Sequence, residues 1–187
     1  MRARIILATV AASLALTLGA AAQPIPTPEE FFGRPLGEDR FLAPYPKIVD
    51  YFRALAAVSP RISLEVAGKS TLDNEMVVVV ITSEQNQQQL ERYRDIARRL
   101  ADPAALSEPE AQQLIAQGKT IVLVTCTIHS TEVASTQMAP EFAYRVATSD
   151  DAHLLGWLDD VILLLMPSIN PDGQVLVVDW YNKYLGT

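Results

Sequence analysis

The chain has 187 residues, of which 49% are hydrophobic and 20% are charged, a composition typical of one globular domain rather than of a disordered segment. Its 22 acidic residues outnumber its 15 basic residues. Nucleic acids and anionic membranes are bound through clustered Lys and Arg, so this balance argues against both as partners.

The first 22 residues have the pattern of a secretory signal peptide. Arg2 and Arg4 precede an uncharged apolar run over residues 5–18, and Ala20 and Ala22 supply the small residues of a cleavage site. An uncleaved membrane anchor is the alternative, but the run is shorter than the roughly 20 residues that span a bilayer. We therefore predict a signal peptide over residues 1–22, a secreted or periplasmic location, and no stable membrane insertion after cleavage.

The mature chain begins with a proline-rich stretch, residues 23–45, which we expect to form an N-terminal arm without regular elements. Helical spacing of apolar residues then predicts a helix from Pro46 to just before Ser59. Residues 62–67 and 76–82 read as two strands of a hairpin at a sheet edge. Helices are predicted over residues 87–100 and 109–117.

Two apolar, β-branched runs follow, residues 120–128 and 159–168, each with the character of a strand buried on both faces of a mostly parallel sheet. A helix over residues 131–147 between them completes a strand–helix–strand unit, although Pro140 should kink this helix or delay its start. The single cysteine, Cys126, is expected to be a buried and inert thiol. The predicted fold class is α/β, with a mixed, largely parallel sheet flanked by helices.

His129 and Glu132 are the residues that point to chemistry. They follow the strand over residues 120–128, at the end where ligands of open α/β sheets gather. An imidazole nitrogen and a carboxylate oxygen are both zinc ligands, and a catalytic zinc site adds one further protein ligand and a water. The alternative is structural: a glutamate in the first turn stabilises a helix through its dipole, and a histidine at a strand end is often only hydrogen-bonded.

Two other interpretations of nearby residues are weaker. A nucleophilic hydrolase would use Cys126, Ser130 or Thr131, but Cys126 cannot easily face His129 on the same short strand, and Ser130 lacks the GxSxG elbow. The second histidine, His153, is expected on the surface near the amino ends of the strands rather than as a third ligand.

Two motifs in order carry a family resemblance. The segment "IHSTEVAST" resembles the HxxE zinc motif of the zinc metallocarboxypeptidases, the carboxypeptidase A-like peptidases, and "LLLMPSINPDGQ" is similar to their strand and "NPDG" segment. The similarity extends over residues 46–173. It implies a Zn2+ cofactor with His129 and Glu132 as the first two ligands, and a peptide or protein substrate whose scissile carbonyl the metal polarises. Residues 170–173 would then shape the floor or rim of the cleft.

The chain also departs from this pattern. Asp73 and Asn74 stand where the family's hairpin has Gly and Arg, and nothing after Gly173 matches the family's carboxylate-binding arginine, third histidine ligand or general-base glutamate. We therefore expect residues 46–187 to be a partial catalytic domain, incomplete at the C-terminus, with no catalytic residue assigned and no peptidase activity alone. Two alternatives are an HxxE amidohydrolase that deacylates N-acyl amino acids and a non-catalytic binding remnant of the peptidase fold. The oligomeric state is not readable from the sequence.

Overall fold

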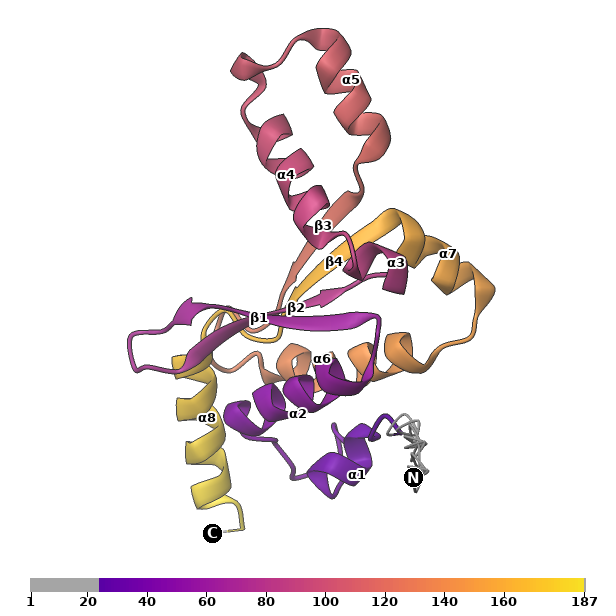
Figure 1. Cartoon of the computed structure of the whole chain (residues 1–187). Coiled ribbons are helices and arrows are strands. Elements are labelled where there is room, and N and C mark those ends of the chain that lie inside the picture. The colour runs from indigo at the N-terminus through magenta and orange to yellow at the C-terminus, as the bar shows by residue number, and fades with distance from the viewer. Residues whose placement is uncertain (1–23, 187) are drawn as a thin grey trace, which may run out of the picture.

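A computed structural model describes residues 24–186 (Figure 1). The predicted signal peptide, residues 1–22, lies outside this part of the chain. Within residues 24–186, no helix combines the length and the apolar character needed to cross a membrane. The helices are α1 (Pro28–Phe32), α2 (Tyr45–Val58), α3 (Glu84–Gln87), α4 (Leu90–Ala101), α5 (Glu108–Gln117), α6 (Val133–Thr148), α7 (Ala152–Asp160) and α8 (Pro171–Tyr184), with a 3-10 turn η1 (Pro103–Ala105). The strands are β1 (Ile62–Lys69), β2 (Glu75–Ile81), β3 (Thr120–Thr125) and β4 (Val161–Met166).

The four strands form one mixed sheet in the order β1-β2-β4-β3. The predicted hairpin is confirmed, because β1 pairs antiparallel with β2 and occupies one edge of the sheet. The predicted strand–helix–strand unit is also confirmed, since β3 and β4 are parallel and α6 and α7 connect them. The parallel part is smaller than expected, however: β2 and β4 pair antiparallel, so only one of the three pairings is parallel.

The N-terminal arm contains a short helix, which corrects the prediction that it lacks regular elements. Thr27 caps α1 by accepting from the Glu30 backbone N–H, and the Glu30 carboxylate accepts from the Thr27 backbone in return. Pro28 occupies the first helical position, where its missing N–H costs nothing. This reciprocal capping box was readable in "TPEE".

Helices cover the two faces of the sheet unequally. The main core lies between the sheet and α2 with α6, where Phe52, Leu55, Val79 and Leu165 are fully buried. A smaller cluster on the opposite face joins the α4–α5 pair to the sheet. Figure 1 shows α4 and α5 standing away from the rest of the molecule as a helical arm.

Strand β3 is not buried on both faces, and that prediction was wrong. All six of its residues are exposed, and among the described residues β3 is an edge strand that pairs only with β4. The apolar run is genuine, and its exposed members are Ile121, Val122, Leu123 and Val124. Burial begins one residue beyond the strand, at Cys126 and Thr127.

Several helix boundaries differ from those predicted. The helix expected over residues 87–100 is α4, and a separate short helix that was not predicted, α3 with a Ser83 cap, precedes it. Helix α6 runs without interruption through Pro140. Helices α7 and α8 were not predicted; α8 begins at Pro171, with the Asn170 side chain accepting from the Gly173 N–H as its cap.

Candidate metal centre

The loop between β3 and α6 is held in an unusual backbone conformation at its start. Thr127 has a φ of +46°, in the left-handed region that β-branched residues rarely adopt. Its N–H donates to Ser135 Oγ at 3.0 Å, and its Oγ1 lies 2.8 Å from the Glu132 carbonyl oxygen. Thr136 Oγ1 is 2.6 Å from the same hydroxyl and donates to the Pro167 carbonyl. This buried polar network fixes where the chain turns out of the sheet.

His129 and Glu132 come together on the outside of this turn. His129 Nδ1 lies 3.0 Å from Glu132 Oε1, and the side chains are 74% and 56% exposed respectively. The His129 backbone N–H points at the other carboxylate oxygen, Oε2, at 3.3 Å. Hydrogen bonds from the His129 side chain and backbone lower the pKa of the Glu132 carboxyl, which therefore favours the ionised form needed for a ligand.

Glu132 does not serve as a helix cap, although it occupies the N-cap position of α6. Its side chain accepts no hydrogen bond from the first-turn amides of the helix. It turns toward His129 instead. The carboxylate thus makes its hydrogen bonds with His129, while its position at the helix start still allows the favourable interaction with the helix dipole.

The donor atoms of this pair fit a shared metal ion. In a tetrahedral zinc site with zinc–ligand distances of ~2.0 to 2.1 Å, two ligand atoms lie roughly 3.3 Å apart. This is close to the separation of His129 Nδ1 and Glu132 Oε1. Among residues 24–186, however, no His, Cys, Asp or Glu joins the pair to make a group of three.

The first turn of α8 lies against the same loop. Asn170 Nδ2 donates to the Ile128 carbonyl at 3.1 Å, directly before His129, and the Ile169 N–H donates to the Cys126 carbonyl at 3.0 Å. A Cβ placed on Gly173 would lie 2.3 Å from Ser130 Oγ. The helix start and the loop are therefore in close contact, and a side chain at position 173 would force the Ser130 hydroxyl or the Asn170 amide to move.

Asp172 connects α8 to the loop between β1 and β2. Its carboxylate accepts from Ser70 Oγ, from Asn74 Nδ2 at 2.8 Å and from the Leu72 N–H at 3.1 Å. The hydrogen bonds from Ser70 and Asn74 lower the pKa of Asp172. Asp73, in the hairpin position where the family resemblance implies glycine, has a φ of +63°, a conformation that Asp adopts more readily than most residues.

The other predicted residues lie where the sequence placed them. Cys126 is buried, and burial raises the pKa of its thiol, as expected for an inert cysteine. His153 is exposed in the first turn of α7, the helix that leads into the amino end of β4.

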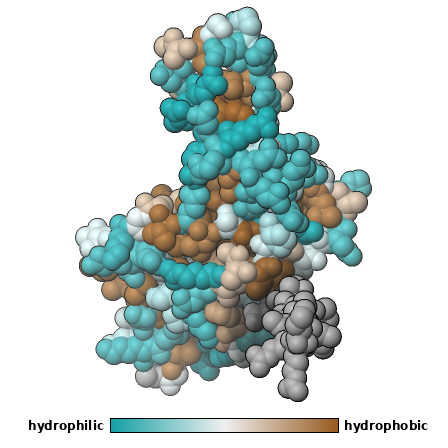
Figure 2. Space-filling model, in the orientation of Figure 1, coloured by the Kyte–Doolittle hydropathy of each residue, from teal (hydrophilic) through white to brown (hydrophobic). Residues whose placement is uncertain are grey.

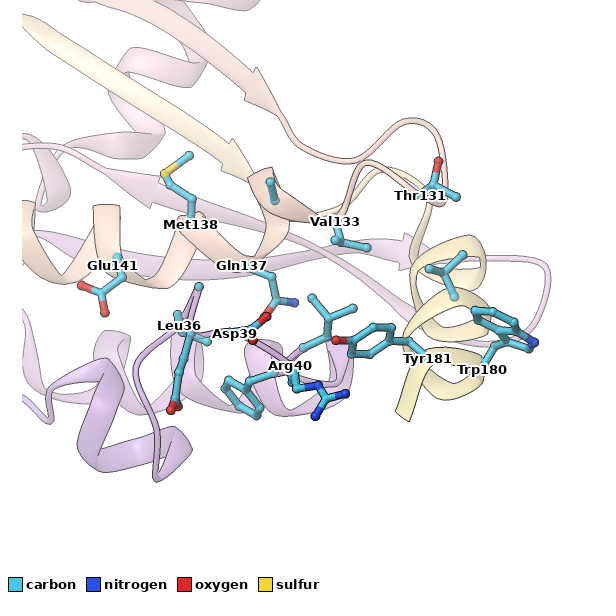
Figure 3. Close-up of a pocket in the computed structure, with 16 residues that line it drawn as sticks. Leu36, Asp39, Arg40, Thr131, Val133, Gln137, Met138, Glu141, Trp180 and Tyr181 are labelled. Carbon is cyan, nitrogen blue, oxygen red and sulfur yellow. The ribbon is translucent and has the colours of Figure 1, made fainter. Parts of the chain in front are cut away.

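A pocket of about 680 Å³ opens beside the loop (Figure 3). Its walls come from residues 36–42 of the N-terminal arm, from α6 and from α8. Thr131 and Val133, which flank Glu132 in the sequence, line it, whereas His129 and Glu132 do not. Gln137 holds the N-terminal arm beside the pocket. Its Oε1 accepts from the Ala43 N–H at 2.8 Å, and its Nε2 donates to the Ala43 carbonyl at 3.1 Å.

Sequence reasoning identified the HxxE pair but missed its supports. The helix start at Asn170 had a signal, since Asn followed by Pro is a common cap and first position. The contacts of Asp172 with residues 70–74 and of Thr127 with α6 had none, because they join segments far apart in the chain or depend on a backbone angle.

The sequence and the fold resemble those of known proteins. The sequence profile of the zinc carboxypeptidase family matches residues 48–183. A carboxypeptidase A structure from Helicoverpa armigera is similar with a TM-score of 0.51 and 14% identity, covering 82% of this chain and 33% of that protein. A structure named as a carboxypeptidase A from Shewanella denitrificans OS-217 gives a TM-score of 0.46 and 17% identity, covering 71% of this chain and 27% of that protein.

Comparison with curated protein sequences gave no match. The chain spans about a third or less of the length of these two solved structures. The likeness to the first of them supports the fold, and the profile match extends over more than half of the chain and includes both the HxxE pair and the start of α8. The chain belongs to the zinc carboxypeptidase family.

Proposed function

We propose that this chain contributes His129 and Glu132 as two ligands of a zinc site for peptide hydrolysis of the carboxypeptidase type. The observation that carries the proposal is the 3.0 Å approach of His129 Nδ1 to Glu132 Oε1 at an exposed loop beyond a sheet strand. Family membership supports the metal identity. When bound, zinc would supply Lewis acidity toward a scissile carbonyl and lower the pKa of a bound water.

The residues of this chain would hold and orient the ion rather than complete the chemistry. His129 would supply an imidazole nitrogen and Glu132 an ionised carboxylate oxygen, and both side chains are accessible from solvent. Catalytic zinc sites use three protein ligands, and the described residues place no third beside this pair. We therefore expect this chain alone to bind zinc weakly and not to turn over peptides.

The pocket beside the loop is a candidate for part of a peptide substrate. Its volume of about 680 Å³ is within the range of ligand sites. Exposed apolar side chains, Met138 and Trp180, line it together with the loop residues Thr131 and Val133. Export of the protein through the signal peptide over residues 1–22 would place this chemistry outside the cytoplasm.

Zinc titration of the purified chain by calorimetry tests the ligand assignment. His129→Ala and Glu132→Gln should each weaken zinc binding by more than about tenfold, since even the loss of a supporting residue costs that much in zinc proteins. His153→Ala is the matched control, an exposed histidine outside the site, and should bind as the parent chain does. A zinc affinity of His129→Ala equal to that of the parent chain would contradict the assignment of His129 as a ligand.

A product assay with the same chain separates the candidate reactions. An N-acylated dipeptide releases its C-terminal residue to a carboxypeptidase, whereas an N-acyl amino acid releases its acyl group to an amidohydrolase. We expect neither product from this chain alone. Zinc-dependent release of the C-terminal residue would contradict the expected inactivity, and zinc-dependent deacylation would favour the amidohydrolase over the peptidase.

A further inference from the structure

The first turn of α8 holds two loops that are distant in the sequence. Asn170 uses both ends of its amide: Oδ1 accepts from the Gly173 N–H at 3.0 Å and caps the helix, while Nδ2 donates to the Ile128 carbonyl at 3.1 Å. Two residues later, Asp172 accepts from three donors of residues 70–74. One helical turn thus connects the HxxE loop with the hairpin loop.

The HxxE loop depends on outside contacts to keep its shape. A β-branched residue with positive φ is strained, and such strain persists only where the surroundings hold it in place. Contacts from α6 hold Thr127 on one side, through Ser135 and Thr136. On the other side, the Asn170 tether to Ile128 is the side-chain contact immediately before His129.

Packing at the helix start leaves the loop little room to shift. Gly173 lies so close to Ser130 that an added Cβ would overlap with the serine hydroxyl at 2.3 Å and with the Asn170 side chain at 2.7 Å. Ser130 is the residue between His129 and Thr131. The loop is therefore confined on both sides of the histidine backbone, by a hydrogen bond before it and a close contact after it.

We propose that the first turn of α8 positions the proposed zinc ligands, with Asn170 as the positioning residue for His129 and Asp172 as the residue that keeps loop 70–74 beside them. The proposal rests on the assignment of His129 and Glu132 as ligands. It gives the "NPDG" segment a role that does not involve contact with metal or substrate. Asn170 acts through the backbone carbonyl of Ile128, one peptide unit away from the histidine.

Asn170→Asp separates the two functions of this residue. An aspartate keeps the oxygen that caps α8, and its charge suits a helix N-terminus. It lacks the amide donor and places a carboxylate oxygen opposite the Ile128 carbonyl. Asn182→Ala is the matched control, because it removes the same kind of bond, Nδ2 to the Leu42 carbonyl, from the other end of α8.

Hydrogen exchange of the metal-free chain provides a readout that does not need zinc. In Asn170→Asp, the amides of residues 128–132 should exchange roughly 3- to 10-fold faster, as expected for one lost hydrogen bond, while α8 stays protected. Zinc affinity should fall by about tenfold, the lower end of the effect of supporting residues in metal sites. Asn182→Ala should change neither quantity.

The outcomes distinguish this inference from the proposed function. Unchanged exchange over residues 128–132 in Asn170→Asp overturns the positioning role, whether or not zinc binds. If the parent chain binds zinc through His129 and Asn170→Asp binds it equally well, the ligand assignment stands and the positioning role fails. If the parent chain does not bind zinc, the ligand assignment fails. Faster exchange in Asn170→Asp then supports only the hydrogen bond from Asn170 to the Ile128 carbonyl as a restraint on the loop. In parallel, Asp172→Asn should speed exchange of residues 70–74 and leave residues 128–132 unchanged.

Discussion

Some residues of this chain matter through the space that they leave, and others through the groups that they carry. Gly173 is the clearest case, because its missing side chain is what lets α8 start against Ser130. Asp73 is the opposite case: a residue with a side chain occupies a left-handed turn position, and the neighbouring Asn74 donates to Asp172. The hairpin departs from the family pattern at these two positions, yet the loop is tied firmly to α8.

Replacement of Gly173 by alanine should destabilise the protein, although alanine usually stabilises a helix. The added Cβ overlaps with Ser130 and Asn170, and overpacking of this kind costs about 1–3 kcal/mol. Gly156→Ala provides the matched control, since Gly156 lies inside α7 with no atom near the new Cβ and should gain roughly 0.5–1 kcal/mol. Urea denaturation measures both free energies of unfolding. If both substitutions change the free energy of unfolding in the same direction, the close contact at Gly173 is contradicted.

Elements of secondary structure were predictable to the extent that local signals defined them. The hairpin, α2 and the β3–α6–β4 order follow from hydrophobic period and turn residues. The exposure of β3 could not be predicted in this way. An apolar run shows that a strand can be buried, but not whether it lies at the edge or in the middle of the sheet. The same limit applies at the site: the spacing of His129 and Glu132 predicted their meeting, but not that Asn170 and Thr127 would hold their loop.

The two edges of the sheet differ in how they resist association. Strand β1 carries Glu65 and Lys69 and has an irregular register between Val66 and Gly68. Strand β3 has no charged residue and exposes four apolar side chains in a row. Natural sheets protect their edges with charges and bulges, so the β3 edge is the one prone to pairing with other chains.

A lysine on β3 should therefore reduce self-association. Leu123, 59% exposed, is the most open apolar residue of the strand, so a lysine there can reach water without disturbing the core. Light scattering of the concentrated chain should show less association for Leu123→Lys than for the parent. Val66→Lys places the same charge on the already protected β1 edge and should have a smaller effect. A similar response of both variants would contradict the assignment of the β3 edge.

The whole molecule consists of a core with the site at one end of β3 and a helical arm at the other. The helical arm, α4 with α5, connects to the first residue of β3, Thr120, whereas the HxxE loop follows its last residue, Thr125. The six residues of the strand separate the two by about 20 Å. Figure 2 shows that the arm is largely hydrophilic and that apolar residues gather on the body at its base. Beneath the surface, Tyr93 and Leu114 of the helical arm form a buried cluster with Val80 and Ile162 of the sheet.

This separation predicts that the arm can be weakened without loss of the site. Leu114→Ala removes a buried side chain from the arm cluster, so hydrogen exchange should rise over residues 90–117 while zinc affinity and the protection of residues 128–132 stay as in the parent chain. Leu55→Ala, in the fully buried main core beneath the sheet, should instead lower the free energy of unfolding of the whole protein by about 2–5 kcal/mol. Exchange measured by mass spectrometry resolves the two responses, since one is confined to the arm and the other extends over all elements. Weaker zinc binding in Leu114→Ala would mean that the arm and the site are coupled through β3, and that the strand transmits strain between its ends.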